Sequence, residues 1–383
     1  MSVTAARGFT ATGIAAGIKQ SGTPDLALVV NEGPRDAAAG VFTANRVKAA
    51  PVLWSERVVK GGRVGSVVLN SGGANACTGP EGFQDTHATA ERVAQLLNQS
   101  AGEVAVASTG LIGTRLPMDA LLGGIGTAAR QLSRHGGEKA ALAIKTTDSV
   151  HKTAVAERDG WTVGGMAKGA GMLAPGLATM LVVLTTDADL AAPELDKALR
   201  EATRSTFDRV DSDGCMSTND TVLLLASGAA ERTPGYAEFA AAVHEVCESL
   251  ARQLIGDAEG ASKDIRIEVV GAATEDDAVT AGRSIARNNL LKCALHGEDP
   301  NWGRVLAAIG TTDAAFEPDR LSVAINGVWV CRDGSIGEDR ELVDMRYRQI
   351  DITADLAAGP ASAVVWTNDL TAEYVHENSA YSS

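Results

Sequence analysis

The sequence lacks any apolar run of the roughly 18 residues that a membrane-spanning helix requires. Its opening residues, MSVTAARGFT, also lack a charged segment followed by an apolar one, so no secretory signal is expected. Positive charge is scarce: 34 Lys and Arg stand against 48 Asp and Glu, a formal net charge of -14. So acidic a chain repels nucleic-acid phosphates and anionic membrane surfaces. We therefore expect a cytoplasmic protein that binds neither nucleic acid nor membranes.

Cysteine and histidine are few and are not spaced as metal ligands. The five cysteines are scattered and include no C-x-x-C pair, which argues against zinc sites and disulfide frameworks and favours small buried side chains. None of the six histidines lies four residues from another, and no H-E-x-x-H sequence occurs. We therefore expect no metal site.

The 383 residues, of which 45% are hydrophobic and 21% charged, have the composition of a folded globular protein with a sizeable core. Blocks with helical spacing of apolar residues alternate with short β-branched runs, which predicts a mixed α/β chain. Helices are expected over 85–98, 117–128, 193–207 and 236–255, with a turn at 299–304 opening another. Strands are expected over 26–30, 66–70, 103–107, 179–184, 221–225, 265–270, 321–326 and 350–354.

Glycine is abundant, with 41 residues, and gathers in turns and a few dense segments. The densest, GGMAKGAGM at 164–172, has no lysine followed by Ser or Thr and no G-x-G-x-x-G opening a helix. This spacing argues against nucleotide binding and predicts a loop.

A small-residue loop, APGLA at 174–178, stands directly before the apolar run TMLVVL at 179–184. Thr179 is therefore expected at the first residue of a buried strand, where an ordinary β-forming threonine is one interpretation. The other is catalytic. If the bond between Ala178 and Thr179 were cut, the hydroxyl would be a nucleophile, and the new α-amine, with a reference pKa of about 7.7–8.0, would be its base. A strained loop is a suitable place for this hydroxyl to attack the preceding carbonyl.

The segment MAKGAGMLAPGLATML at 166–181 resembles the self-cleavage and active-site segment of the ornithine acetyltransferase family, the glutamate N-acetyltransferases of arginine biosynthesis. The resemblance extends over essentially the whole chain. Further matching segments are NSGGANACTG (70–79), STGLIG (108–113), TTD (146–148), STNDT (217–221), DAEGASK (257–263), GEDPNWGR (297–304) and ENSAYSS (377–383).

The resemblance implies cleavage between Ala178 and Thr179 into an α chain, residues 1–178, and a β chain, residues 179–383, with Thr179 as the nucleophile. It implies an α-β-β-α sandwich akin to the N-terminal-nucleophile hydrolases, with smaller α/β parts in the second chain. It places Thr109 and Gly110 in an oxyanion hole. The implied substrate contacts are Thr146, Lys168, Thr179, Glu259, Asn378 and Ser383.

Taken alone, several of these residues have plainer interpretations. Thr109 and Gly110 follow an expected strand, where a hydroxyl and a backbone N–H can point outward, but a polar turn is the alternative. Lys168 is either an exposed loop lysine or an anchor for a substrate carboxylate. Glu259, after a helix end, would by itself be a solvated carboxylate. The last six residues could contact a substrate only if the tail folded back over the site.

The sequence thus predicts an enzyme that moves the acetyl group of N2-acetylornithine to glutamate through an acetyl-Thr179 intermediate. The resemblance implies no bound cofactor; acetyl-CoA is a second donor in many members, although this sequence shows no dedicated coenzyme A motif. It also implies two αβ pairs or a multiple of them. The alternatives are a related N-terminal-nucleophile amidohydrolase or aminopeptidase, a paralogue serving secondary metabolism, and an uncleaved amino-acid-binding protein.

Overall fold

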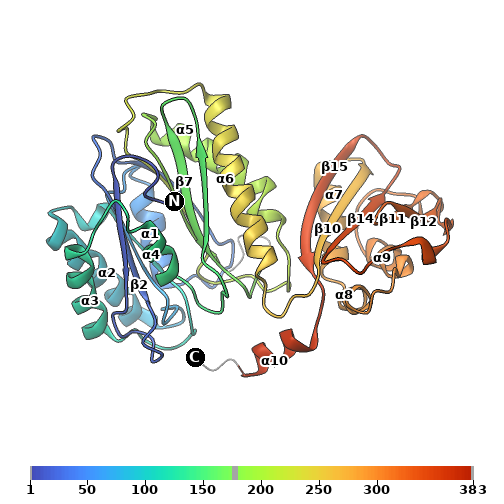
Figure 1. Cartoon of the computed structure of the whole chain (residues 1–383), viewed down its shortest axis with the longest axis horizontal. Coiled ribbons are helices and arrows are strands. Elements are labelled where there is room, and N and C mark those ends of the chain that lie inside the picture. The colour runs from blue at the N-terminus through green and yellow to red at the C-terminus, as the bar shows by residue number, and fades with distance from the viewer. Residues whose placement is uncertain (1, 175–179, 381–383) are drawn as a thin grey trace.

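A computed structural model describes residues 2–174 and 180–380 and shows two lobes, a larger one that carries both ends of the expected cleavage segment and a smaller one formed by residues 264–368 (Figure 1). The larger lobe contains two sheets. The first has the order β1-β2-β4-β5, and the second the order β3-β9-β8-β7-β6. The strands of the first are β1 Phe9–Ile14, β2 Leu26–Asn31, β4 Ser66–Asn70 and β5 Val104–Ser108; those of the second are β3 Ala37–Phe42, β6 Lys152–Glu157, β7 Thr162–Lys168, β8 Leu181–Thr186 and β9 Thr221–Ala226.

Successive side chains of a strand point to opposite faces of its sheet, so each sheet has an inner face toward the other sheet and an outer face toward helices. In β2, Ala27 and Val29 pack into a core that also takes Met166 and Val183 from the second sheet, so the two sheets face each other. The alternate residue Leu28 packs with the helices on the opposite face. The helices of the larger lobe are α1 Ala50–Val59, α2 Gly79–Leu97, α3 Met118–Arg130, α4 Gly137–Ala143, α5 Ala192–Ser205 and α6 Tyr236–Gly256.

Two of these helices cover each outer face. α2 and α3 pack on the first sheet, and α5 and α6 pack on the second through a core that includes Leu195, Phe239 and Leu250. The larger lobe is therefore an α-β-β-α sandwich, as the resemblance implied.

The smaller lobe is a six-stranded sheet in the order β13-β12-β11-β14-β10-β15. Strand β10 alternates buried and half-buried residues, as expected for a sheet covered by helices on one face. The elements of this lobe are β10 Asp264–Ala272, α7 Glu275–Ala286, α8 Asn289–His296, α9 Trp302–Ile309, β11 Ser322–Ile325, β12 Val328–Arg332, β13 Ser335–Ile336, β14 Gln349–Asp355 and β15 Ala361–Asn368. A last helix, α10 Ala372–Ala380, turns back from this lobe toward the larger one (Figure 1).

The structure corrects two sequence predictions. The glycine-rich segment is not all loop, since β7 runs through Gly164 and Gly165 to Lys168. A Cβ at Gly164 would lie 2.3 Å from the Ser2 carbonyl oxygen, so glycine allows a close backbone approach inside the strand. The expectation of buried cysteines is wrong for the three that are exposed: Cys77, Cys215 and Cys293.

The strand predicted over residues 179–184 corresponds to β8, which the structure describes from Leu181 to Thr186. Ala178 and Thr179 lie outside the described residues. No helix in residues 2–174 or 180–380 is long and apolar enough to span a membrane.

Candidate active site

Thr109 and Lys168 meet where the two sheets of the larger lobe come together. Thr109 directly follows β5, and Lys168 is the last residue of β7. The Lys168 side chain is buried, and its Nζ donates to Thr109 Oγ1 over 3.1 Å. Burial lowers the pKa of Lys168 against the opposing charge of Asp148. The interpretation of Lys168 as an exposed loop lysine is therefore wrong.

The backbone around Gly110 requires glycine. Its φ is +133°, and a Cβ there would lie 2.6 Å from the Gly73 nitrogen. Gly73 N–H donates to the Thr109 carbonyl, and Thr109 N–H donates to Asn70. Within the described part of the chain, the Gly110 N–H has no backbone partner of this kind.

Thr146 lies in a loop that is tied to the end of β7. The Thr146 N–H donates to Asp148 Oδ2 over 3.0 Å, and the Gly169 N–H donates to Asp148 Oδ1 over 2.6 Å. Burial alone would raise the pKa of Asp148, but the ammonium groups of Lys168 and Lys152 and its hydrogen bonds lower it to about 2. Asp148 is therefore a buried anion that holds Thr146 and the segment after Lys168 together.

Glu259 is not a freely solvated carboxylate. Its Oε1 accepts a hydrogen bond from Thr147 Oγ1 over 2.7 Å, and its Oε2 accepts one from Asn378 Nδ2 over 2.9 Å. A Cβ at Gly171 would lie 2.4 Å from Glu259 Oε2, so the carboxylate rests against the glycine-rich segment. The tail thus folds back far enough for Asn378 to reach this site. The loop contact of Glu259 is made by Thr147, the neighbour of Thr146, which sequence reasoning did not single out.

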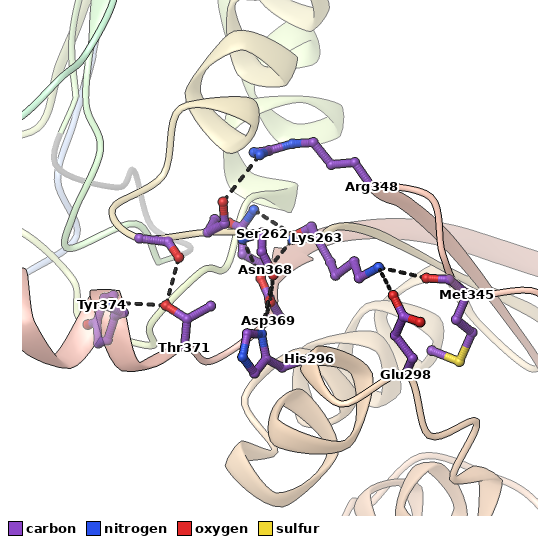
Figure 2. Close-up of polar contacts among 12 residues, drawn as sticks. Ser262, Lys263, His296, Glu298, Met345, Arg348, Asn368, Asp369, Thr371 and Tyr374 are labelled. Carbon is purple, nitrogen blue, oxygen red and sulfur yellow. Dashed lines mark hydrogen bonds and ion pairs between the residues drawn. The ribbon is translucent and has the colours of Figure 1, made fainter.

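Asp369 joins the two chain segments that connect the lobes (Figure 2). Its Oδ1 accepts from the N–H groups of Ser262 and Lys263 over 2.9 and 2.8 Å. Its Oδ2 lies 2.8 Å from His296 Nδ1 and accepts from the Ser262 hydroxyl. Ser262 Oγ also lies 3.2 Å from His296 Nδ1, so the hydroxyl, the imidazole and the carboxylate form one polar cluster at the connection between the lobes.

Thr371 anchors the start of α10 beside this cluster. Its hydroxyl donates to the Gly260 carbonyl over 2.7 Å and accepts from the Tyr374 N–H over 3.0 Å (Figure 2). Gly260 is one residue from Glu259, so the same contact sets the distance between Glu259 and the helix that carries Asn378.

Asp220 contacts Met180, the second residue after the expected cleavage point. Its side chain is fully buried, and Oδ1 accepts from the Met180 N–H over 3.1 Å. Burial raises the pKa of Asp220 well above its ordinary value. The neighbouring Asn219 donates to the carbonyls of Ala74 and Ser108, which ties this segment to the end of β5. Sequence reasoning missed Asp220, although an acidic residue directly before a buried strand was a visible signal.

The structure thus brings together Thr109 with Lys168 and Glu259 with Asn378. Thr179, Ala178 and Ser383 lie outside the described residues. Among residues 2–174 and 180–380, no three His, Cys, Asp or Glu side chains are grouped so as to hold a metal.

A buried cation and a carboxylate held by neighbouring loops, where the ends of two facing sheets meet, can bind small molecules that carry opposite charges. The chain belongs to the ArgJ family, whose sequence profile matches residues 10–383. It is 79% identical to the arginine biosynthesis bifunctional protein ArgJ of Streptomyces avermitilis over 383 residues, covering 100% of both chains. It is 58% identical to that of Mycobacterium leprae, covering 100% of this chain and 96% of the other.

Among solved structures, the chain is similar to an ornithine acetyltransferase of Mycobacterium tuberculosis that was determined in complex with ornithine. The identity is 60% over 47% of this chain and 96% of the other, with a TM-score of 0.45. Similarity to an arginine biosynthesis bifunctional protein of Bacillus halodurans covers 51% of this chain and 97% of the other, at 34% identity and a TM-score of 0.49.

Proposed function

We propose that this enzyme is a glutamate N-acetyltransferase, which takes the acetyl group from N2-acetylornithine and transfers it to glutamate. The names of the ArgJ relatives, arginine biosynthesis bifunctional proteins, support the pathway, and the resemblance of residues 166–181 to the ornithine acetyltransferases supports the donor. The observation that carries the proposal is the hydrogen bond from the buried Lys168 ammonium to the Thr109 hydroxyl. This contact places the Thr109 hydroxyl, a donor for an oxyanion, beside the Lys168 ammonium, a cation for a substrate carboxylate.

In this scheme the chain cleaves itself between Ala178 and Thr179, giving the α chain 1–178 and the β chain 179–383. The Thr179 hydroxyl then attacks the acetyl carbonyl of N2-acetylornithine, while the Thr179 α-amine accepts the hydroxyl proton. The Thr109 hydroxyl and the Gly110 N–H stabilise the oxyanion. As the intermediate collapses, the C–N bond breaks, the Thr179 α-ammonium returns its proton to the leaving amine, and ornithine departs. The neutral amine of glutamate then attacks the acetyl carbonyl, and the Thr179 α-amine accepts its proton. The C–O bond to Thr179 breaks, this proton passes to the Thr179 oxygen, and N-acetylglutamate leaves.

The substrate contacts follow from charge. An ammonium can donate three hydrogen bonds, and the described residues take one of those of Lys168, so others remain for the α-carboxylate of either substrate. Glu259 suits the side-chain ammonium of ornithine and lies between Thr147 and Asn378. Thr146 and Ser383 complete the proposed contacts. The scheme requires neither a metal nor a bound cofactor.

Product analysis tests the proposal. Purified enzyme with N2-acetylornithine and glutamate should form ornithine and N-acetylglutamate in equal amounts. Release of acetate without glutamate dependence would favour an amidohydrolase, and no turnover of acetylornithine would overturn the proposal. Replacing the donor with acetyl-CoA tests the second activity that "bifunctional" in the relatives' names suggests.

A denaturing gel tests the cleavage. The wild-type protein should give two bands, whereas Thr179→Ala should give one band and no transfer. Thr179→Ser, which keeps a hydroxyl, should retain part of both reactions. Two bands of the expected sizes from the alanine variant would show that another group cuts the chain.

Location and assembly are also part of the proposal. Exposed free thiols at Cys77, Cys215 and Cys293 suit the reducing cytoplasm. The resemblance suggests that αβ pairs assemble further, and light scattering should give the mass of two pairs or a multiple.

A further inference from the structure

A buried charge network of Asp148, Lys152 and Asp257 lies behind the proposed substrate contacts. Lys152 Nζ donates to Asp148 Oδ1 over 2.7 Å and to Asp257 Oδ2 over 2.5 Å. The Lys152 and Asp148 side chains are 0% exposed and that of Asp257 is 10% exposed. Buried ion pairs are often no more stabilising than apolar residues of similar volume. Stability is therefore a weak explanation of the network, whereas its other hydrogen bonds indicate a specific role.

One carboxylate of the network holds two parts of the site. Asp148 accepts from the N–H of Thr146 and from the N–H of Gly169, the residue after Lys168. A shift of Asp148 would therefore move Thr146, a proposed substrate contact, and the end of β7, where the Lys168 ammonium reaches Thr109.

The second carboxylate holds the other side of the same loop. Asp257 accepts from the N–H groups of Ser149 and Val150 and from the Ser149 hydroxyl. Two residues further on, Glu259 accepts from Thr147. The turn after α6 thus contacts the loop at residues 147, 149 and 150, and Glu259 moves with it.

Lys152 is the fixed point between these carboxylates. It begins β6, and its backbone is paired with Ala167 of β7, next to Lys168. The sheet therefore determines the position of its side chain, and the ammonium transmits that position to both Asp148 and Asp257.

We propose that Lys152 is a positioning residue for acetyl transfer, which sets the spacing of Thr146, Lys168 and Glu259 through Asp148 and Asp257. This inference rests on the proposed function for the identity of the substrates. Lys152 does not touch substrate; its removal separates groups that must bind one small molecule together.

The test compares Lys152→Met and Asp257→Asn with Lys263→Met. Lys263 is a matched control because it is also a buried lysine, and its ammonium meets Glu298 and the Met345 carbonyl in the smaller lobe (Figure 2). Loss of one charge-assisted contact predicts that the KM for N2-acetylornithine and the Kd for ornithine each rise about tenfold in Lys152→Met and Asp257→Asn. We expect kcat to change less than KM, and both constants to stay at wild-type values in Lys263→Met.

Hydrogen exchange supplies a readout that needs no substrate. Amides of residues 146–150 should exchange faster in Lys152→Met and Asp257→Asn than in the wild type and Lys263→Met. If Lys152→Met does not fold, Asp257→Asn, which keeps the shape of the side chain, decides the question. Wild-type exchange in this loop for both variants, or wild-type KM with only a lower Tm, would overturn the positioning role. Absence of transfer by the wild type would instead refute the proposed function, and the exchange result would still stand.

Discussion

Lys168 ends a strand of one sheet and Thr109 directly follows a strand of the other, and the 3.1 Å hydrogen bond between Nζ and Oγ1 joins the ends of β7 and β5. An ammonium only donates, so the Thr109 oxygen accepts and its own O–H remains free to point elsewhere. The contact therefore leaves the hydroxyl of Thr109 able to donate to an oxyanion. The same bond fixes a positive charge beside it.

Replacing Lys168 should impair both half-reactions. Lys168→Met removes the proposed carboxylate anchor and the partner of Thr109, and loss of one charge-assisted hydrogen bond corresponds to about 1.5–3 kcal/mol. We expect lower kcat/KM for both N2-acetylornithine and glutamate, measured by steady-state kinetics beside Lys263→Met. Unchanged KM and kcat for both substrates would show that Lys168 does not bind them.

A methyl group at Gly110 should disrupt the proposed oxyanion hole. Gly110→Ala would need φ of +133° and would bring Cβ to 2.6 Å from the Gly73 nitrogen. Loss of one oxyanion donor lowers kcat by about 10²–10³-fold, so turnover should fall steeply even in the folded fraction.

The control for this variant is Gly123→Ala in α3. A Cβ there has no neighbour within 4 Å, and alanine in a helix interior should stabilise by about 0.5–1 kcal/mol. Normal kcat in folded Gly110→Ala would show that its N–H takes no part in the reaction.

Asp220 should make stability fall as pH rises. Because burial raises its pKa well above its ordinary value, the folded protein holds a proton there that the unfolded chain releases between the two pKa values. Asp220→Asn mimics the neutral acid. The free energy of unfolding of this variant, measured in urea at pH 5 and pH 8, should not fall with pH as that of the wild type does.

Asp148→Asn is the control, since the pKa of Asp148 is about 2 and its carboxylate is ionised throughout this range. The contribution of Asp148 is lost only at acid pH, as the pH falls below its unfolded value toward 2. A wild-type pH slope in Asp220→Asn would show that Asp220 is ionised in the folded state.

The pH profile tests the identity of the catalytic base. An amine works as a base only when neutral, so kcat/KM should rise with pH through an ionisation near or below the reference value of about 7.7–8.0 and then level off. No single histidine replacement should remove this rise if the Thr179 amine is the base. The histidines to replace are His87, His135, His151, His244, His296 and His376. Loss of the rise and of most activity in one folded, cleaved variant would indicate a Thr–His pair.

Local sequence pattern predicted the elements whose packing is regular. The helix expected at 236–255 is α6 Tyr236–Gly256, and the strand expected at 66–70 is β4 Ser66–Asn70. Each carries a continuous apolar face, and the spacing and extent of its apolar residues indicate both the type of element and its length. Strand β7 was missed because its glycines leave no side-chain pattern, although they serve close packing.

The site depended on contacts that no local pattern contains. The resemblance identified Thr109, Lys168, Glu259 and Asn378, but the burial of Lys168 is tolerated because Asp148 lies nearby in space. The Asp369 cluster likewise joins residues 262, 296 and 369, which are remote in sequence.

Strands β7 and β8 flank the expected cut and pair antiparallel over six residues, from Val163 opposite Thr186 to Lys168 opposite Leu181. β8 is also paired with β9, so both products of a cut at residue 178 contribute inner strands to one sheet. The cut would therefore turn folding from a reaction of one chain into a reaction of two chains, while the sheet keeps the same strands. Refolding of the mature protein should be second order and faster at higher protein concentration, whereas the uncut Thr179→Ala chain should refold at a rate independent of concentration.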